Sequence, residues 1–153
     1  HLICMRHETF ESALRSTWQL VSKMYSKEAL QFDSTMAMGF ALLSIDSEGT
    51  PSTNLGPKMG MEPTSLSRLL NAMEERGLIN RIKNPNDGRG VLIHLTPEGK
   101  KHRENSKAVV LDFNEKIDQQ LTQQQVQHFF EVIECIRETT SNFKHFNTTI
   151  TQT

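Results

Sequence analysis

The chain has 153 residues, 36% of them hydrophobic, and its longest nearly unbroken apolar run, 36–43, is far shorter than the ~20 residues that cross a bilayer. Two cysteines exclude a disulfide framework, and the absence of an export-signal pattern at the start of the chain favours a cytoplasmic protein without a membrane partner. The net charge of −1 conceals a basic middle, because residues 50–103 carry nine Lys and Arg against five Asp and Glu, a charge balance that suits DNA phosphates.

A first amphipathic helix is predicted over 8–29. Apolar side chains recur there every three to four residues, at Phe10, Leu14, Trp18 and Val21. One face of this helix must therefore pack against another element.

A second helix should form the buried centre of the fold, because 36–45 is apolar on nearly every side. Asp33 or Ser34 is expected to cap its N-terminus. A Ser/Thr/Asn cluster at 52–54 then offers the N-cap of a short third helix that ends at Gly60.

A fourth helix is predicted over 63–76, with a proline in its first turn. Its leucines and Met73 fall at helical spacing and form a buried stripe, whereas Thr64, Arg68 and Asn71 point to the opposite side. Hydroxyls and an arginine near the start of an exposed helix suit a DNA major groove, where arginine binds guanine in a bidentate way. A surface helix with a polar outer face is the alternative for this segment alone.

A β-hairpin follows, formed by two runs rich in β-branched residues at 78–84 and 91–95. Asp87-Gly88 is a strong turn signal, and Arg89 at the tip is expected to enter a minor groove, attracted by its negative potential. Two alternatives remain open: Asp87 holds Arg89 or the turn in position, or the hairpin is simply solvated.

Two further helices are predicted from 97 to 147. Val110 and Phe113 belong to the apolar stripe of the first, and Thr122 with Gln125 makes a capping box that opens the second. Together with the first helix of the chain, these stripes offer more apolar surface than the helices and hairpin between them can cover, so a second copy of the chain is the expected partner. Packing within one chain is the alternative.

The ordered set of motifs resembles the MarR family of winged helix-turn-helix transcriptional regulators. The resemblance implies a mainly α fold with a small β-hairpin wing, in which a winged helix-turn-helix core over 34–96 is flanked by dimerisation helices at 8–29 and 97–147. The motifs that carry it are Leu66-Ser67-Arg68-Leu69-Leu70, the run 73–79, Asp87-Gly88-Arg89 and the run 95–100.

The resemblance further implies a homodimer that places two recognition helices in successive major grooves of a palindromic operator, with wing arginines in the flanking minor grooves. The function that the resemblance implies is that of a sequence-specific DNA-binding transcriptional regulator, acting as a ligand-responsive repressor. The residues expected to contact double-stranded DNA are Thr53, Thr64, Ser65, Ser67, Arg68, Asn71, Lys83, Asp87 and Arg89.

One feature departs from the family's pattern, because Gly56-Pro57 interrupts the helix before the turn. That helix should be short or start late. The departure weakens the expectation of phosphate contacts from Thr53, Asn54 or Lys58.

The resemblance also implies a crevice for a small aromatic or anionic effector between the dimer helices and the winged core. Core packing is the alternative for every residue expected to approach it. Those residues are Trp18, Tyr25, Phe32, Met36 and Phe40.

No nucleophile beside a base, phosphate-cradling loop or metal constellation is visible, so neither an enzyme nor a cofactor nor a metal is expected. Some members of the family sense oxidants through a cysteine that usually lies within the first helix, whereas Cys4 precedes that helix. Cys135, with apolar neighbours, is expected to be buried and inert, and whether either thiol senses redox stays open. The alternative function is a winged helix that binds proteins without specific DNA binding. Binding to DNA that is absent or insensitive to salt would favour that alternative.

Overall fold

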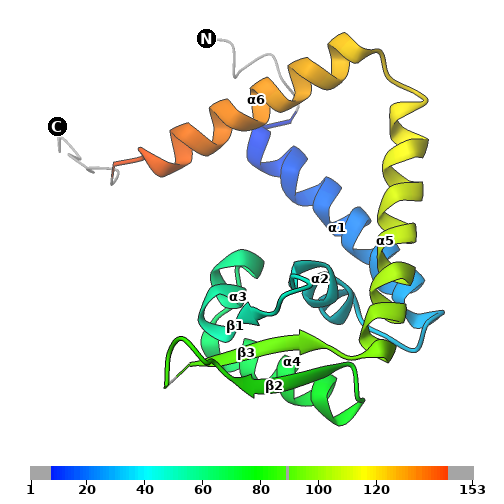
Figure 1. The fold of residues 1–153 in the computed structure, drawn as a ribbon. Helices are drawn as coiled ribbons and strands as arrows, with labels where there is room; N and C mark the ends of the chain where they lie inside the picture. The colour runs from blue at the N-terminus through cyan, green and yellow to red at the C-terminus, as the bar shows by residue number, and fades with distance from the viewer. Residues whose placement is uncertain (1–7, 89, 145–153) are drawn as a thin grey trace, which may run out of the picture. The chain divides into compact units, whose positions relative to one another are not determined.

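The computed structural model describes residues 8–88 and 90–144, which contain six helices and a small three-stranded sheet (Figure 1). The expected fold class, mainly α with a small β-hairpin wing on a winged helix-turn-helix, is confirmed. The chain divides into two compact units, one up to Leu111 and one from Asp112. The elements are α1 (Phe10–Leu30), α2 (Met36–Ser44), β1 (Thr50–Pro51), α3 (Ser52–Met59), α4 (Pro63–Glu75), β2 (Ile79–Lys83), β3 (Val91–Leu95), α5 (Pro97–Asp118) and α6 (Gln123–Ser141).

The sheet is antiparallel with the strand order β1-β3-β2. Strands β2 and β3 form the expected hairpin, in a register that pairs Ile79 with Leu95 and Lys83 with Val91. The strand β1 was not expected from the sequence, because two residues are too short to show the alternation that identifies a strand. It pairs Thr50 with Ile93 and so joins the segment before α3 to the wing.

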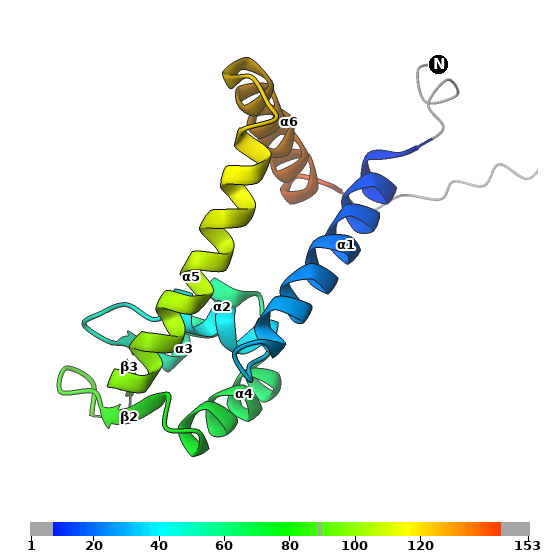
Figure 2. The same ribbon diagram turned by 90° about the vertical axis from the view of Figure 1, so that its right-hand side faces the viewer.

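One hydrophobic core holds α2, α3, α4 and the sheet together, and Figures 1 and 2 show these elements gathered into one lobe. We call this part the winged lobe. The expected burial of the second helix and of the α4 stripe agrees with this core. Its buried members are Met38, Ala41, Leu42, Ile45, Leu55, Leu66, Leu70, Met73, Leu78, Ile79 and Ile93.

The N-cap of α2 is Thr35, whose hydroxyl accepts a hydrogen bond from the Met38 backbone N–H at 3.2 Å. The expectation of Asp33 or Ser34 as the cap is therefore wrong. Both residues instead close the end of α1, since their backbone N–H groups donate to carbonyls of that helix and Asp33 is in the left-handed region with φ 50°. Which of these adjacent residues caps α2 is therefore decided by where the preceding helix, α1, ends.

The helix α3 is short, as expected, with 8 residues, and Gly56-Pro57 lies within it without delaying its start. It begins at Ser52, within the cluster that was expected to cap it, and its N-cap is Pro51, which makes no side-chain capping bond. Gly56 is buried, and its carbonyl accepts the backbone N–H of Met61 at 2.9 Å across the turn. A Cβ at this position would lie 3.3 Å from the Met61 carbonyl oxygen, so the glycine lets the turn close tightly before α4.

The helix α5 begins against the backbone of the winged lobe. A Cβ built on Gly99 would lie 1.9 Å from the Leu78 carbonyl oxygen, so only glycine permits this approach. Thr96 caps the helix, because its hydroxyl accepts the Gly99 backbone N–H at 2.9 Å and donates to the Gly77 carbonyl. The run 95–100 thus anchors α5 to the lobe.

The flanking helices bury almost nothing in one chain: α1 and α6 have no buried residue, and α5 has only Gly99. The expected capping box of Thr122 and Gln125 is present at the start of α6. The helix ends at Ser141 instead of reaching 147, of which 145–147 lie outside the described residues. Cys135 is exposed, so the expectation that it is buried is wrong for the single chain.

Candidate nucleic-acid interface

The helix α4 presents a polar face to solvent. Pro63 opens the helix, and Leu66, Leu70 and Met73 are buried on its inner side. All five residues of α4 that the sequence singled out for DNA contact are exposed, namely Thr64, Ser65, Ser67, Arg68 and Asn71. A helix that is anchored on one side and polar on the other has the form of a major-groove reader.

Four of these side chains are available for new contacts. In the described part of the chain, Thr64, Ser65, Ser67 and Arg68 take part in no side-chain hydrogen bond or ion pair. Their hydroxyls are short donors and acceptors, and the guanidinium of Arg68 is a planar fork of donors. These donors are therefore available to hydrogen-bond acceptors along the groove of a binding partner.

Asn71 differs from the other four because its amide oxygen accepts a hydrogen bond from Arg81 Nη2 at 2.8 Å. Arg81 lies on β2 and also forms an ion pair with Glu74, its Nη1 standing 3.5 Å from the carboxylate. Two residues of α4 are thereby tied to the wing strand. The sequence analysis did not single out Arg81, which was only one of the basic residues of the middle segment.

The wing is closed by a network of backbone hydrogen bonds. Asn84 donates to the Gly90 carbonyl at 2.8 Å, and Gly90 donates to the Asp87 carbonyl at 3.0 Å. Asp87 in turn donates to the Asn84 carbonyl at 3.3 Å. Asp87 therefore takes part in building the turn, while Lys83 is exposed at the end of β2. Arg89 lies outside the described residues.

A groove of about 840 Å³ lies between α3, α4 and the sheet. Of the described residues expected to contact DNA, Thr53 and Ser67 line it, and Arg81 lines it as well. Glu62, at the start of α4, is the acidic residue in the lining.

A second, smaller cavity of about 40 Å³ lies between α1, α2 and the first part of α5. Four of the five residues expected at an effector crevice line it: Tyr25, Phe32, Met36 and Phe40. Trp18 does not line it but stacks on Phe40, with ring centroids 6.5 Å apart. The five side chains are thus brought together, although one of them supports the cavity wall from behind.

The polar groups of this cavity are few. Burial raises the pKa of the Tyr25 phenol, so its neutral form is favoured. The Ser34 hydroxyl is buried and has no hydrogen-bond partner among the described residues. His102 lines the wall and lies 3.3 Å from the Glu98 carboxylate. A buried hydroxyl without a partner is costly, and a bound molecule or water would satisfy it.

The described residues contain no group of three or more His, Cys, Asp or Glu side chains arranged to hold a metal ion. No described helix is both long and apolar enough to span a membrane.

Residues 35–91 match the model of the MarR family. A curated relative, the HTH-type transcriptional regulator YhbI of Bacillus subtilis, is 30% identical over 98 residues, which cover 63% of this chain. The match spans 64% of that relative's own length, which is less than two thirds. The HTH-type transcriptional regulator SarZ of Staphylococcus saprophyticus is 28% identical over 137 residues, covering 85% of each chain.

Among solved structures, the chain is similar to the MepR protein of S. aureus in its complex with DNA, with a TM-score of 0.79. The sequence identity is 19%, and the match covers 87% of this chain and 99% of that one. At this identity the likeness establishes the fold alone. The names of the relatives agree with the expectation of a regulator in place of an enzyme.

Proposed function

We propose that this chain, whose residues 35–91 match the model of the MarR family, is a sequence-specific DNA-binding transcriptional regulator. The observation that carries the proposal is the outer face of α4, where Thr64, Ser65, Ser67 and Arg68 are exposed and unengaged. In the major groove, Arg68 would bind guanine and the hydroxyls would bind phosphates or base edges. The wing residues Lys83, Asp87 and Arg89 would bind or organise contacts beside that groove.

The regulator would act as a homodimer on a palindromic operator. The flanking helices support this, since α6 exposes 56% of Phe129 and 60% of Phe130 in the single chain. Aromatic rings exposed side by side on a helix with no buried residue favour burial against a second copy. Two recognition helices related by a dyad would read half-sites about one helical turn, ~10 base pairs, apart. Such a protein would work in the cytoplasm, with the chromosomal DNA.

We further propose that the cavity beside Phe40 makes the protein a ligand-responsive repressor. It touches α2, and α2 packs against both α3 and α4. A small aromatic or anionic molecule that displaces α2 would therefore move the reading helix. The cavity is smaller than the ~300–1,000 Å³ of most ligand sites, so a ring would enter by displacing a flexible side chain such as Met36.

The first test is selection of duplexes from a random pool by the purified protein at two salt concentrations, with the molecular mass measured on the same sample. We expect a dimer that selects an inverted repeat and binds it more weakly at the higher salt. A folded dimer that selects no sequence at low salt would contradict the proposal. It would favour a winged helix that binds proteins instead of DNA.

A further inference from the structure

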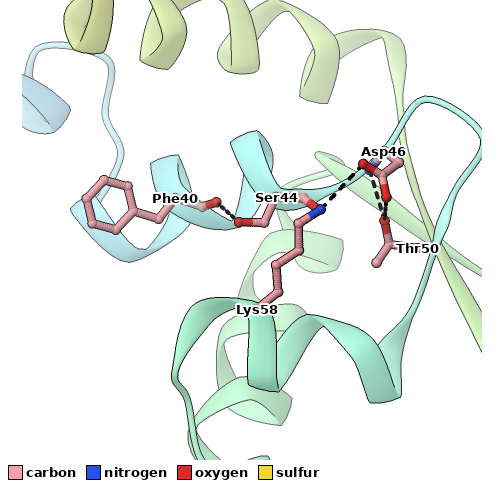
Figure 3. Close-up of polar contacts among 5 residues, drawn as sticks. All are labelled: Phe40, Ser44, Asp46, Thr50 and Lys58. Atoms are coloured by element: carbon pink, nitrogen blue, oxygen red, sulfur yellow. Dashed lines mark hydrogen bonds and ion pairs between the residues drawn. The ribbon is translucent and has the colours of Figure 1, made fainter. Parts of the chain in front are cut away.

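Lys58 lies in the last turn of α3, the helix that precedes the recognition helix. A basic residue on the first helix of a helix-turn-helix would ordinarily be assigned to the DNA backbone. In this structure its ammonium group, on a side chain that is 45% exposed, is engaged by groups of the lobe itself. Its Nζ donates to the Ser44 carbonyl at 2.7 Å and stands 3.4 Å from Asp46 Oδ1 (Figure 3).

The Ser44 carbonyl is the last of α2, where the negative end of the helix dipole is concentrated. The last turn of α2 carries no basic residue of its own. Lys58 therefore supplies, from another helix, the positive charge that this helix end lacks. The side chain of Ser44 turns back along α2 instead, its hydroxyl donating to the Phe40 carbonyl at 2.7 Å.

Asp46 extends this contact to the sheet. Its backbone N–H donates to the Thr50 hydroxyl at 2.9 Å, and that hydroxyl donates to Asp46 Oδ2 at 3.3 Å. Thr50 is 2% exposed and pairs with Ile93 on β3. The Asp46 carboxylate is 67% exposed, but it accepts a hydrogen bond from a buried hydroxyl, so Lys58 meets an acid whose position is restrained.

We propose that Lys58 and Asp46 form a clamp that fixes α3 against the end of α2, so that Lys58 is a positioning residue for DNA binding and not a phosphate contact. The inference rests on the proposed DNA-binding function. The clamp sets where α3 lies, and the tight turn after Gly56 passes that position on to the start of α4. Its loss weakens DNA binding by misplacing the recognition helix.

The sign of one substitution separates the two roles of Lys58. If Lys58 bound phosphate, Asp46→Asn would release its ammonium group and remove an acid near DNA, so affinity would rise. If Lys58 and Asp46 form a clamp, the same substitution lowers affinity, by about threefold for a partly exposed pair. Glu48→Gln is the matched control, because it removes an exposed acid from the same turn without touching the clamp.

The salt dependence of Lys58→Met gives a second readout on the selected duplex. A clamp predicts a loss of affinity of about tenfold with an unchanged slope of log affinity against log salt. A phosphate contact from each subunit predicts a slope smaller by about two. A shallower slope, or an affinity gain for Asp46→Asn that equals that of Glu48→Gln, would overturn the proposal.

Folding and function are kept apart by thermal unfolding of Lys58→Met, Asp46→Asn and the double variant. The clamp predicts that the effect of the double variant on the midpoint is smaller than the sum of the two single effects, because both substitutions remove the Lys58–Asp46 ion pair. This holds even if the wild-type chain selects no duplex, a result that would contradict the proposed function alone. Additive effects would overturn the clamp. If Lys58→Met does not fold, the affinity of Asp46→Asn for the selected duplex, compared with that of Glu48→Gln, still distinguishes the clamp from a phosphate contact.

Discussion

The winged lobe and the flanking helices differ in where their apolar side chains go. The three lobe helices are short, with 9, 8 and 13 residues, yet each contributes to a common core. The helices α1 and α6 are much longer, with 21 and 19 residues, and bury none of theirs. Helices as short as those of the lobe are unstable alone in water, so packing and not length stabilises them.

This difference indicates that the two regions have different roles. The lobe satisfies its hydrophobic surface within one chain and can hold α4 in a fixed position. The flanking helices keep apolar stripes that one chain leaves open, which is expected of surfaces that pair with a second copy. The stability of the winged lobe and the stability of the dimer should therefore be changed by different substitutions.

The sharpest test of this comparison uses two leucines. Leu42 in α2 is 0% exposed, whereas Leu20 in α1 is 72% exposed. Leu42→Ala leaves a cavity in the lobe core and should lower the free energy of unfolding by about 2–5 kcal/mol. Leu20→Ala should change it by no more than about 0.5 kcal/mol. Both are measured by chemical denaturation at one fixed protein concentration. A loss at Leu20 as large as that at Leu42 would place Leu20 in a buried interface.

The assembly half of the comparison is tested on α6. Phe130→Asp puts a charge into the apolar stripe and should raise the dimer dissociation constant by at least about 100-fold, because an unpaired charge in an apolar interface is costly. Gln124→Asp introduces the same charge at a polar, exposed position of the same helix and should leave the dimer intact. Sedimentation measures the mass, and circular dichroism checks that the lobe remains folded. If the mass of the two variants is the same, α6 does not form the interface.

The reading surface is tested with two arginines, one from each region. Arg68→Ala should weaken binding to the selected operator by about 1–3 kcal/mol and relax selectivity at one position of each half-site. Arg15, on α1, is exposed and pairs with Glu11 on its own helix, so Arg15→Ala should not change selectivity. Binding is measured on the operator and on variants with single base changes. Equal losses on all of these duplexes would make Arg68 a phosphate contact instead of a base contact.

The sequence predicted the elements well because their signals are local. The spacing of Leu66, Leu70 and Met73 placed α4, and Asp87-Gly88 placed the wing turn. The cap of α2 was predicted one or two residues too early, since three adjacent side chains suit a cap and the end of α1 selects among them.

What the sequence did not predict depends on contacts between elements. Arg81 meets Asn71 only because β2 and α4 pack in a particular register. Lys58 meets the end of α2 across 14 positions of the chain. Cys135 was expected to be buried because its neighbours in the sequence are apolar, but it is exposed in the part of the chain that the structure describes. Periodicity shows that a face is apolar and does not show what covers it.

The smallest effect expected concerns an arginine that only the structure revealed. Arg81 is 31% exposed in its side chain and bonds to both Asn71 and Glu74, so Arg81→Met should lower the free energy of unfolding by about 0.5–1.5 kcal/mol. Its counterpart on α6 is Arg137, which pairs with Glu134 with both side chains largely exposed. Arg137→Met should change stability by less than about 0.5 kcal/mol, as screened surface pairs contribute little.

The same pair of variants distinguishes whether Arg81 acts on DNA through α4 or by direct contact. If it holds Asn71 and Glu74 in place, Arg81→Met weakens operator binding while the salt slope stays constant, and Asn71→Ala has an effect in the same direction. If it binds a phosphate, Arg81→Met lowers the salt slope as well as the affinity. Equal stability losses for Arg81→Met and Arg137→Met would remove the distinction between a lobe that fixes its charged side chains and helices that leave theirs in solvent.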